Sequence, residues 1–347
     1  MQKRGNKYGI HRVIEPEGVL PQPANKIDND MSEIYDNEIL IDVKTLNIDS
    51  ASFTDISARA CGDKSKIAEI MLDIVAKQGK HRNPWTGSGG MLLGVVEKIG
   101  DAIKDKIDLK VGDKIATLVS LSLTPLRIDK IKEIRAEVDQ VDIDGKAILF
   151  ESGIYAKIPA DMPEKLALSA LDVAGAPAQT AKLVKPGHTV LIIGAGGKSG
   201  MLCCYEAKKR AGVTGKVIGL CGSPKSAARL EKLNFCDHVF VANATQPVPV
   251  LEEIEKLTNG QMCDVTINNV NIPDTEMTSI LCTKDTGLVY FFSMATSFTK
   301  AALGAEGVGS DVTMLVGNGY TKGHAEITLQ ELRESPELRK IFEEMYG

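Results

Sequence analysis

The sequence predicts an α/β protein in which a β-rich first part is followed by a doubly wound parallel sheet. Before Pro163, short runs of alternating apolar and polar residues are separated by Gly and Asp turns, which is typical of half-buried strands. After Pro163, unbroken apolar strands alternate with helical segments, the pattern of a parallel sheet buried on both faces. A length of 347 residues accommodates about two domains.

Strands are predicted at three places in the first part. The segment EILIDVKTL at 38–46 alternates apolar and polar residues, so it is expected to bury one face. Further strands are expected at 94–100 and, after a turn, at 111–116. The charged stretch 128–141 fits either a short surface helix or a surface strand, and its pattern does not separate the two.

The second part alternates helices and strands. Residues 163–184 are rich in Ala and Leu and predict a helix that ends before Pro186-Gly187. The apolar run TVLIIG at 189–194 predicts a buried parallel strand, and residues 198–211 predict the helix after it. The alternation continues with strands at 216–221, 238–241, 264–268 and 287–292, a helix at 225–233 and a charged C-terminal helix at 329–345.

The turn GAGGKSG at 194–200 joins a buried strand to a helix. Gly194 allows the tight turn, the next glycines let backbone N–H groups approach a pyrophosphate, and Gly200 lets the helix pack closely. The N-terminus of that helix presents free N–H groups and a partial positive charge to phosphates. A P-loop is excluded because it needs a glycine where Ile192 stands. The turn therefore predicts a nicotinamide dinucleotide site in a Rossmann domain, with these contacts: Gly194, Gly196, Gly197, Lys198 and Ser199.

Cofactor choice is usually made at the end of the second strand, where an acidic residue binds the ribose of NAD. Here the segment Cys221-Gly-Ser-Pro-Lys225 contains no acid. Ser223 and Lys225 either receive the 2′-phosphate of NADP or act as a helix cap and a solvated charge. NAD is expected, with NADP open. Residues after the later strands are expected at the ribose and nicotinamide: Asn268, Asn269, Val270 and Ser293.

Composition and charge exclude several classes of protein. The net charge of −5 gives no basic surface for nucleic acid. No apolar run is long enough to span a membrane, and the basic N-terminal residues lack the apolar stretch of a secretory signal. The seven scattered cysteines indicate reduced thiols. We expect a cytoplasmic protein that binds a small-molecule substrate.

Several motifs together resemble the medium-chain dehydrogenase/reductase superfamily. They are VGDKI at 111–115, VKPGHTVLIIG at 184–194, the glycine turn and the glycine-rich strand at 94–100. The resemblance implies a GroES-like catalytic domain at 1–165, completed by about 320–347, and a Rossmann domain at 166–319. It also implies a homodimer or homotetramer.

The catalytic zinc of many superfamily members has no counterpart in this sequence. The first ligand position falls on Asp49, the histidine of the Gly-His-Glu motif falls on Gly90, and the third ligand position falls near Asp172. Catalytic zinc needs three side-chain ligands, and glycine supplies none. We therefore expect no zinc.

The chain more closely resembles a zinc-free branch of the superfamily that oxidises the 3-amino group of a 3,5-diamino acid and releases ammonia. The resemblance rests on YGIHRV at 8–13, NPWTGSGGMLLG at 83–94 and GAGGKSGML at 194–202. An amine must lose a proton before it can give up hydride, and water must then attack the imine with the help of a base. Asp49, Asp172 and His81 are the candidate catalytic groups, and Arg59 and Arg82 are candidates for the substrate carboxylate.

Two alternatives remain open from the sequence. A zinc-free enone or quinone reductase of the same superfamily needs an apolar pocket rather than acids. A non-catalytic protein that keeps the dinucleotide-binding fold is the other, because fold alone does not fix chemistry.

Overall fold

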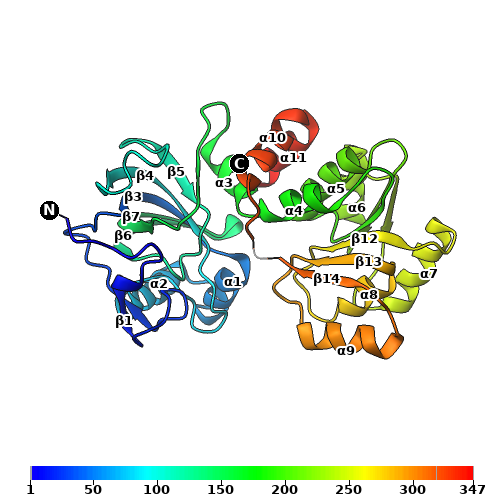
Figure 1. The fold of residues 1–347 in the computed structure, drawn as a ribbon, viewed down its shortest axis with the longest axis horizontal. Coiled ribbons are helices and arrows are strands. Elements are labelled where there is room, and N and C mark those ends of the chain that lie inside the picture. The colour runs from blue at the N-terminus through cyan, green and yellow to red at the C-terminus, as the bar shows by residue number, and fades with distance from the viewer. Residues whose placement is uncertain (1, 318, 347) are drawn as a thin grey trace. The chain divides into compact units, whose positions relative to one another are not determined.

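The computed structural model describes residues 2–317 and 319–346, and the chain divides between Leu168 and Ser169 into two compact units (Figure 1). The first unit is built on an antiparallel sheet and the second on a parallel one. This arrangement confirms the predicted fold class. Among the described residues, no helix is both long and apolar enough to cross a bilayer.

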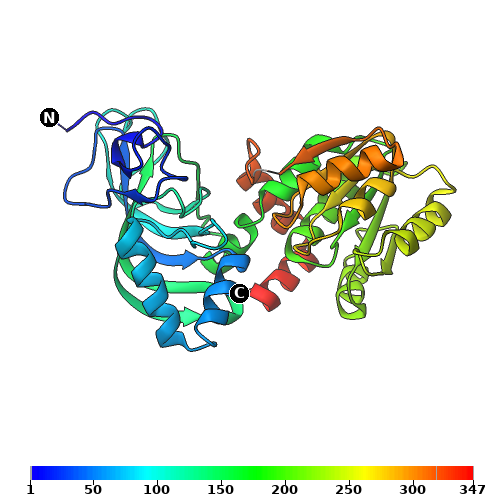
Figure 2. The same ribbon diagram turned by 90° about the horizontal axis from the view of Figure 1, so that it is seen from below.

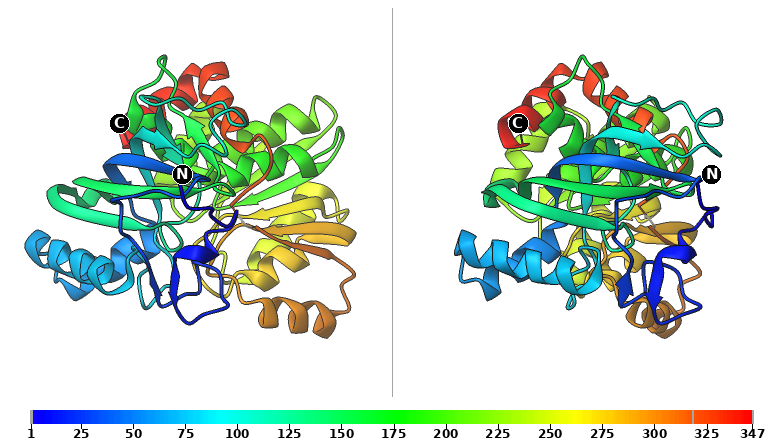
Figure 3. Two further views of the ribbon diagram at one scale, coloured as in Figure 1. Left: turned by 60° about the vertical axis from the view of Figure 1, so that its left-hand side comes forward. Right: turned by 90° about the vertical axis from the view of Figure 1, so that its left-hand side faces the viewer.

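A six-stranded sheet with the order β6-β7-β3-β4-β5-β8 forms the first unit. The predicted strands are present, and the ambiguous stretch 128–141 lies in the β6–β7 hairpin at the sheet edge (Figure 3). The bounds are β3 Glu38–Asn47, β4 Met91–Ile99, β5 Lys114–Thr117, β6 Leu126–Arg135, β7 Gln140–Phe150 and β8 Tyr155–Lys157, with 3₁₀ turn η2 Ala136–Val138. A small separate sheet pairs β1 (Val13–Glu15) with β2 (Lys26–Ile27), after η1 Ile10–Arg12.

Two helices that the sequence analysis did not predict cover one face of this sheet, α1 (Ser50–Arg59) and α2 (Lys64–Gln78) (Figure 2). Asp49 caps α1 by accepting a hydrogen bond from Ser52 N at 3.0 Å. The α2 helix buries Ile67, Met71, Ile74 and Val75, which recur at helical spacing against the sheet core.

The N-terminal segment is fixed to the sheet by a buried ion pair. Arg12 donates to Glu38 through Nε at 2.6 Å and Nη2 at 2.7 Å, and both side chains are almost fully buried. His11 Nε2 and Tyr35 N also contact the Glu38 carboxylate, at 2.8 and 2.9 Å. These hydrogen bonds overcome the effect of burial and lower the pKa of Glu38 to about 2.

The second unit contains a six-stranded parallel sheet with the order β11-β10-β9-β12-β13-β14. Its chain order reverses between β9 and β12, which is the switch point at which such sheets bind dinucleotides. Figure 1 shows α5 and α6 on one side of the sheet and α8 and α9 on the other. The strands are β9 Thr189–Ile193, β10 Lys216–Cys221, β11 His238–Val241, β12 Cys263–Asn268, β13 Thr283–Phe291 and β14 Thr313–Val316.

Two of the long predicted helices are each divided in two. The stretch 163–184 forms α3 and α4, and the C-terminal stretch forms α10 and α11, which are separated at Ser335 before Pro336. Helix α10 contacts α4 and α5, so the described residues 320–346 cluster with the second unit. The helices are α3 Glu164–Leu171, α4 Gly175–Leu183, α5 Lys198–Ala211, α6 Pro224–Leu233, α7 Pro247–Thr258, α8 Glu276–Leu281, α9 Phe298–Val308, α10 His324–Glu334 and α11 Pro336–Tyr346.

Candidate active site and dinucleotide site

The glycine turn of the second unit is held by backbone contacts that exclude side chains. Gly194 has φ +80°, and a Cβ on it would lie 2.8 Å from Val270 Cγ2 at the end of β12. A Cβ on Gly200 would lie 2.1 Å from the Gly194 oxygen, so α5 begins directly against the turn. Gly197 precedes α5 and carries no capping side chain, so the first N–H groups of the helix remain available to a phosphate.

Lys198, the first residue of α5, forms an ion pair with Asp172. Its Nζ lies 3.0 Å from Asp172 Oδ2 and 5.1 Å from the centre of the Tyr346 ring in α11. Asp172 lies in the connection between α3 and α4. The structure therefore brings a predicted catalytic acid to a predicted cofactor residue, within the second unit.

The end of β10 combines a helix cap with an unpredicted arginine contact. Ser223 Oγ accepts from Ser226 N at 3.3 Å and caps α6, and Lys225 is exposed. Cys221 is buried, which raises the pKa of its thiol. Arg229 of α6 donates to the Gly196 oxygen at 3.1 Å. Nothing in the spacing of the sequence pointed to Arg229, because the contact depends on how α6 packs.

The end of β12 contains two asparagines in different states. Asn268 is buried, donates to Thr275 Oγ1 at 2.8 Å and Ser279 Oγ at 2.9 Å, and accepts from Val270 N at 3.1 Å. It is therefore held as a structural residue of the strand end. Asn269 Nδ2 is buried and has no hydrogen-bond partner among the described residues, so it is the available donor here. Ser293, after β13, accepts from Ala295 N at 3.1 Å.

The first unit places Asp49 and His81 on either side of the Gly89-Gly90 pair. Asp49 Oδ1 accepts the capping hydrogen bond, whereas Oδ2 is buried and has no partner within the described ranges. His81 is fully buried, and neither ring nitrogen has a partner in that part of the chain. Burial lowers the pKa of His81 to about 4, and the charge of Asp49 and weak backbone contacts to Gly89 and to His81 itself oppose this shift.

Gly90 occupies a position that cannot accept a side chain. Its φ is +96°, and a Cβ would lie 2.1 Å from Asn47 O and 2.7 Å from Asp49 N. The missing zinc histidine is thus replaced by a glycine that the local backbone requires. The described residues include no group of three or more His, Cys, Asp or Glu side chains that could hold a metal ion.

Arg59 is held above an aromatic ring. Its guanidinium lies 3.4 Å from the centre of the Trp85 ring, and its Nε lies 3.0 Å from Asp55 Oδ2. Asn83 Nδ2 donates to the same Asp55 oxygen at 3.1 Å, so the loop that starts at Asn83 and helix α1 form one network. Arg82 is partly buried, and its backbone oxygen accepts from Gln78.

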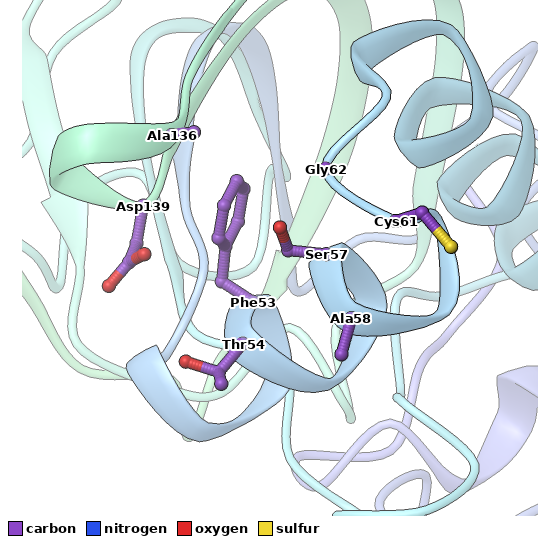
Figure 4. Close-up of a pocket in the computed structure, with 8 residues that line it drawn as sticks. All are labelled: Phe53, Thr54, Ser57, Ala58, Cys61, Gly62, Ala136 and Asp139. Carbon is purple, nitrogen blue, oxygen red and sulfur yellow. The ribbon is translucent and has the colours of Figure 1, made fainter.

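A cavity of about 430 Å³ lies beside α1 and η2 (Figure 4). Figure 4 shows Phe53 and Ser57 pointing into it from α1 and Asp139 at its rim. Its lining contains Phe53, Thr54, Ser57, Ala58, Cys61, Gly62, Ala136 and Asp139, none of which the sequence analysis selected.

Comparison with known proteins gives one close set of relatives. Residues 11–159 match the family described as L-erythro-3,5-diaminohexanoate dehydrogenase N-terminal domain. The L-erythro-3,5-diaminohexanoate dehydrogenases of Acetoanaerobium sticklandii and Fusobacterium nucleatum are 66% and 64% identical, over 99% of both chains in each case.

Solved structures are similar in fold at much lower identity. Quinone oxidoreductase of Pseudomonas syringae pv. Tomato is 21% identical, with a TM-score of 0.53 over 92% of this chain and 85% of that chain. Escherichia coli quinone oxidoreductase complexed with NADPH is 17% identical, with a TM-score of 0.52 over 100% and 88%. These similarities confirm the predicted superfamily fold.

Proposed function

Because the chain belongs to the L-erythro-3,5-diaminohexanoate dehydrogenase family, we propose that it oxidises (3S,5S)-3,5-diaminohexanoate to 5-amino-3-oxohexanoate and releases ammonia. The identity of 66% over nearly the whole chain is the observation that carries this function. The chain is accordingly an oxidoreductase that acts on an amine. The enone or quinone reductase alternative is not favoured, since those proteins share only the fold. The resemblance to amine-oxidising relatives also supports a role in anaerobic lysine fermentation.

The second unit fits a nicotinamide dinucleotide. The N–H groups at the start of α5, with Gly194, Gly196, Gly197, Lys198 and Ser199, are suited to a pyrophosphate. When bound, the nicotinamide accepts hydride from C3 of the substrate. We assign NAD as the physiological cofactor, because Ser223 is already engaged as the cap of α6. Lys225 is the exposed cation beside it, and this keeps NADP as the alternative.

Asp49 is suited to take a proton from the substrate amine. An ammonium group has no lone pair to drive hydride loss, so a base must first remove one proton. Asp49 Oδ2 has no competing donor among the described residues, while Oδ1 is fixed by the α1 cap. The carboxylate is therefore oriented by its own helix and can accept a proton at one defined atom.

Charged residues of both units support further roles. Arg59 and Arg82 are proposed to bind the substrate carboxylate, for which a guanidinium provides a two-pronged donor. The ion pair with Lys198 supports a positioning role for Asp172, which holds that lysine at the glycine turn. We expect a homodimer or homotetramer in the cytoplasm; light scattering after size-exclusion chromatography tests the oligomeric state.

The activity assay supplies the diamino acid with NAD or NADP and follows reduced nicotinamide absorbance and ammonia. Equal amounts of both products with the wild-type protein are expected. Absence of reduction with either cofactor would overturn the proposed function. Asp49→Asn is expected to lower kcat at least about 100-fold while dinucleotide affinity stays unchanged. Asp172→Asn is expected to weaken dinucleotide binding and to leave the pH profile of kcat in place, whereas loss of one limb of that profile would make Asp172 a base.

A further inference from the structure

His81 and Asp49 of the first unit have buried side-chain atoms without a hydrogen-bond partner among the described residues, as do Asn37 and Arg135. His81 has an exposed fraction of 0%, and both of its ring nitrogens are unpartnered within the described residues. Asp49 Oδ2 is also buried and has no hydrogen-bond partner there. A buried polar atom without a hydrogen bond destabilises the folded protein by about 1–3 kcal/mol. Three such atoms on two neighbouring residues indicate that a small polar ligand completes their hydrogen bonds.

Backbone atoms of the two residues pack against a pair of consecutive glycines, and the Asp49 charge acts on the His81 ring. A Cβ on Gly89 would lie 2.3 Å from the His81 oxygen, and a Cβ on Gly90 would lie 2.7 Å from Asp49 N. The space beside each glycine is therefore closed by backbone, that of His81 at Gly89 and that of Asp49 at Gly90. Since neither glycine can carry a side chain there, no side chain at these positions can satisfy the imidazole or the carboxylate.

The protonation state of His81 suits a neutral partner. Burial is the largest influence on its pKa and lowers it, so the ring is neutral near pH 7. A neutral imidazole has one N–H donor and one acceptor nitrogen. It can therefore orient a water molecule without placing a positive charge beside Asp49.

We propose that Asp49 and His81 together hold the water molecule that hydrolyses the substrate imine, a proposal that rests on the function given above. The N–H of His81 donates to the water oxygen, and Asp49 Oδ2 accepts one of its protons. His81 is a positioning residue in this scheme, because it acts on the water and does not itself take a proton.

The step balances without a further reactant. After hydride has left C3, the substrate carries an iminium double bond between C3 and nitrogen. Asp49 first passes the proton that it took from the amine to solvent, so that its carboxylate is charged again. The water oxygen then forms a bond to C3 while one water proton passes to Asp49, which gives a neutral carbinolamine. Asp49 returns the proton to the nitrogen, the C3–N bond breaks as ammonia leaves, and the hydroxyl proton passes back to Asp49 as the 3-oxo group forms.

A first-turnover experiment separates hydride transfer from hydrolysis. The enzyme is mixed with the diamino acid and NAD, neither of which is at a lower molar concentration than the enzyme. Reduced nicotinamide and ammonia are measured in the same samples. His81→Leu removes both ring nitrogens and keeps an apolar side chain of similar bulk. We expect this variant to form one equivalent of NADH per site at nearly the wild-type rate. Ammonia should then follow about 100-fold more slowly, since misplacement of a reacting group by about 1 Å can cost that factor.

Two further variants make the result decisive. His81→Gln retains a donor and an acceptor and should recover part of the ammonia rate. His238→Leu changes an exposed histidine of β11 and should leave both phases unchanged. If His81→Leu fails to fold, His81→Gln alone decides: a selective delay of ammonia supports the water site, and unaltered kinetics overturn it.

Several outcomes contradict the proposal. Equal slowing of NADH and ammonia in the His81 variants would assign His81 to binding or folding, and unchanged ammonia release would remove the water site. Wild-type protein that forms no NADH at all would instead show that the proposed function has failed.

Discussion

Substitution of Gly200 by alanine tests whether backbone contact closes the glycine turn. The added Cβ would lie 2.1 Å from the Gly194 oxygen and 2.7 Å from Ala195 Cα, where ordinary contacts start at 3.4 Å. Both neighbouring atoms are backbone, so α5 must move by about 1 Å, and overpacking of this kind costs about 1–3 kcal/mol. We expect Gly200→Ala to lose about 3 kcal/mol of unfolding free energy and at least tenfold in dinucleotide affinity.

Gly197→Ala is the matched control in the same turn. Its Cβ would lie 3.3 Å from the Gly194 oxygen, and its φ of −84° suits alanine. We expect a change in unfolding free energy below about 0.5 kcal/mol. Dinucleotide affinity should nevertheless fall, because a methyl group there keeps phosphate oxygens away from the backbone N–H groups.

Urea unfolding and titration with reduced nicotinamide, followed by its fluorescence, measure the two quantities. The reasoning predicts loss of stability and affinity for Gly200→Ala but loss of affinity alone for Gly197→Ala. Wild-type stability and affinity in Gly200→Ala would refute the contact argument. Equal loss of stability in both variants would show that the spacing to Gly194 does not decide the effect.

Three other variants probe buried polar groups. Glu38→Gln removes the buried carboxylate partner of Arg12, which then keeps the partly exposed Asp28, and should cost about 3 kcal/mol by urea unfolding. The pKa of Glu38 is about 2 in the folded protein, compared with 4.5 for an ordinary glutamate. The stabilisation that its charge provides is therefore complete above pH 4.5 and is lost as the pH falls towards 2. A wild-type unfolding free energy that is unchanged between pH 5 and 2 would contradict this. Burial and Glu206 raise the pKa of Glu331, so wild-type stability should fall as the pH rises from about 4.5 towards the raised folded pKa. Glu331→Gln should flatten the unfolding profile above pH 4.5, and parallel profiles would reject this. Asn83→Ala removes buried hydrogen bonds to α1 and should lose about 1–3 kcal/mol, whereas an unchanged melting temperature would dispute the network.

Local sequence was sufficient for the part of the dinucleotide site that lies within one stretch of chain. A buried strand, a glycine turn and a helix follow one another from Thr189 to Ala211, so their spacing in sequence sets their spacing in space. Helix α1 was not predicted, although Asp49 and Ser52 form a recognisable cap, because the alternating strands around it dominated the pattern.

Amino-acid order alone determined the two types of sheet, the turn at Gly194–Gly200 and the absence of a histidine at Gly90. Only the tertiary structure decided that Arg229 reaches Gly196, that Lys198 pairs with Asp172, and that His81 is fully buried. Periodicity reports which face of an element is apolar, and it carries no information on which distant segment covers a given side chain. Burial and charge pairing depend on those distant segments, and they set the pKa of His81 and leave Asp49 Oδ2 free to act.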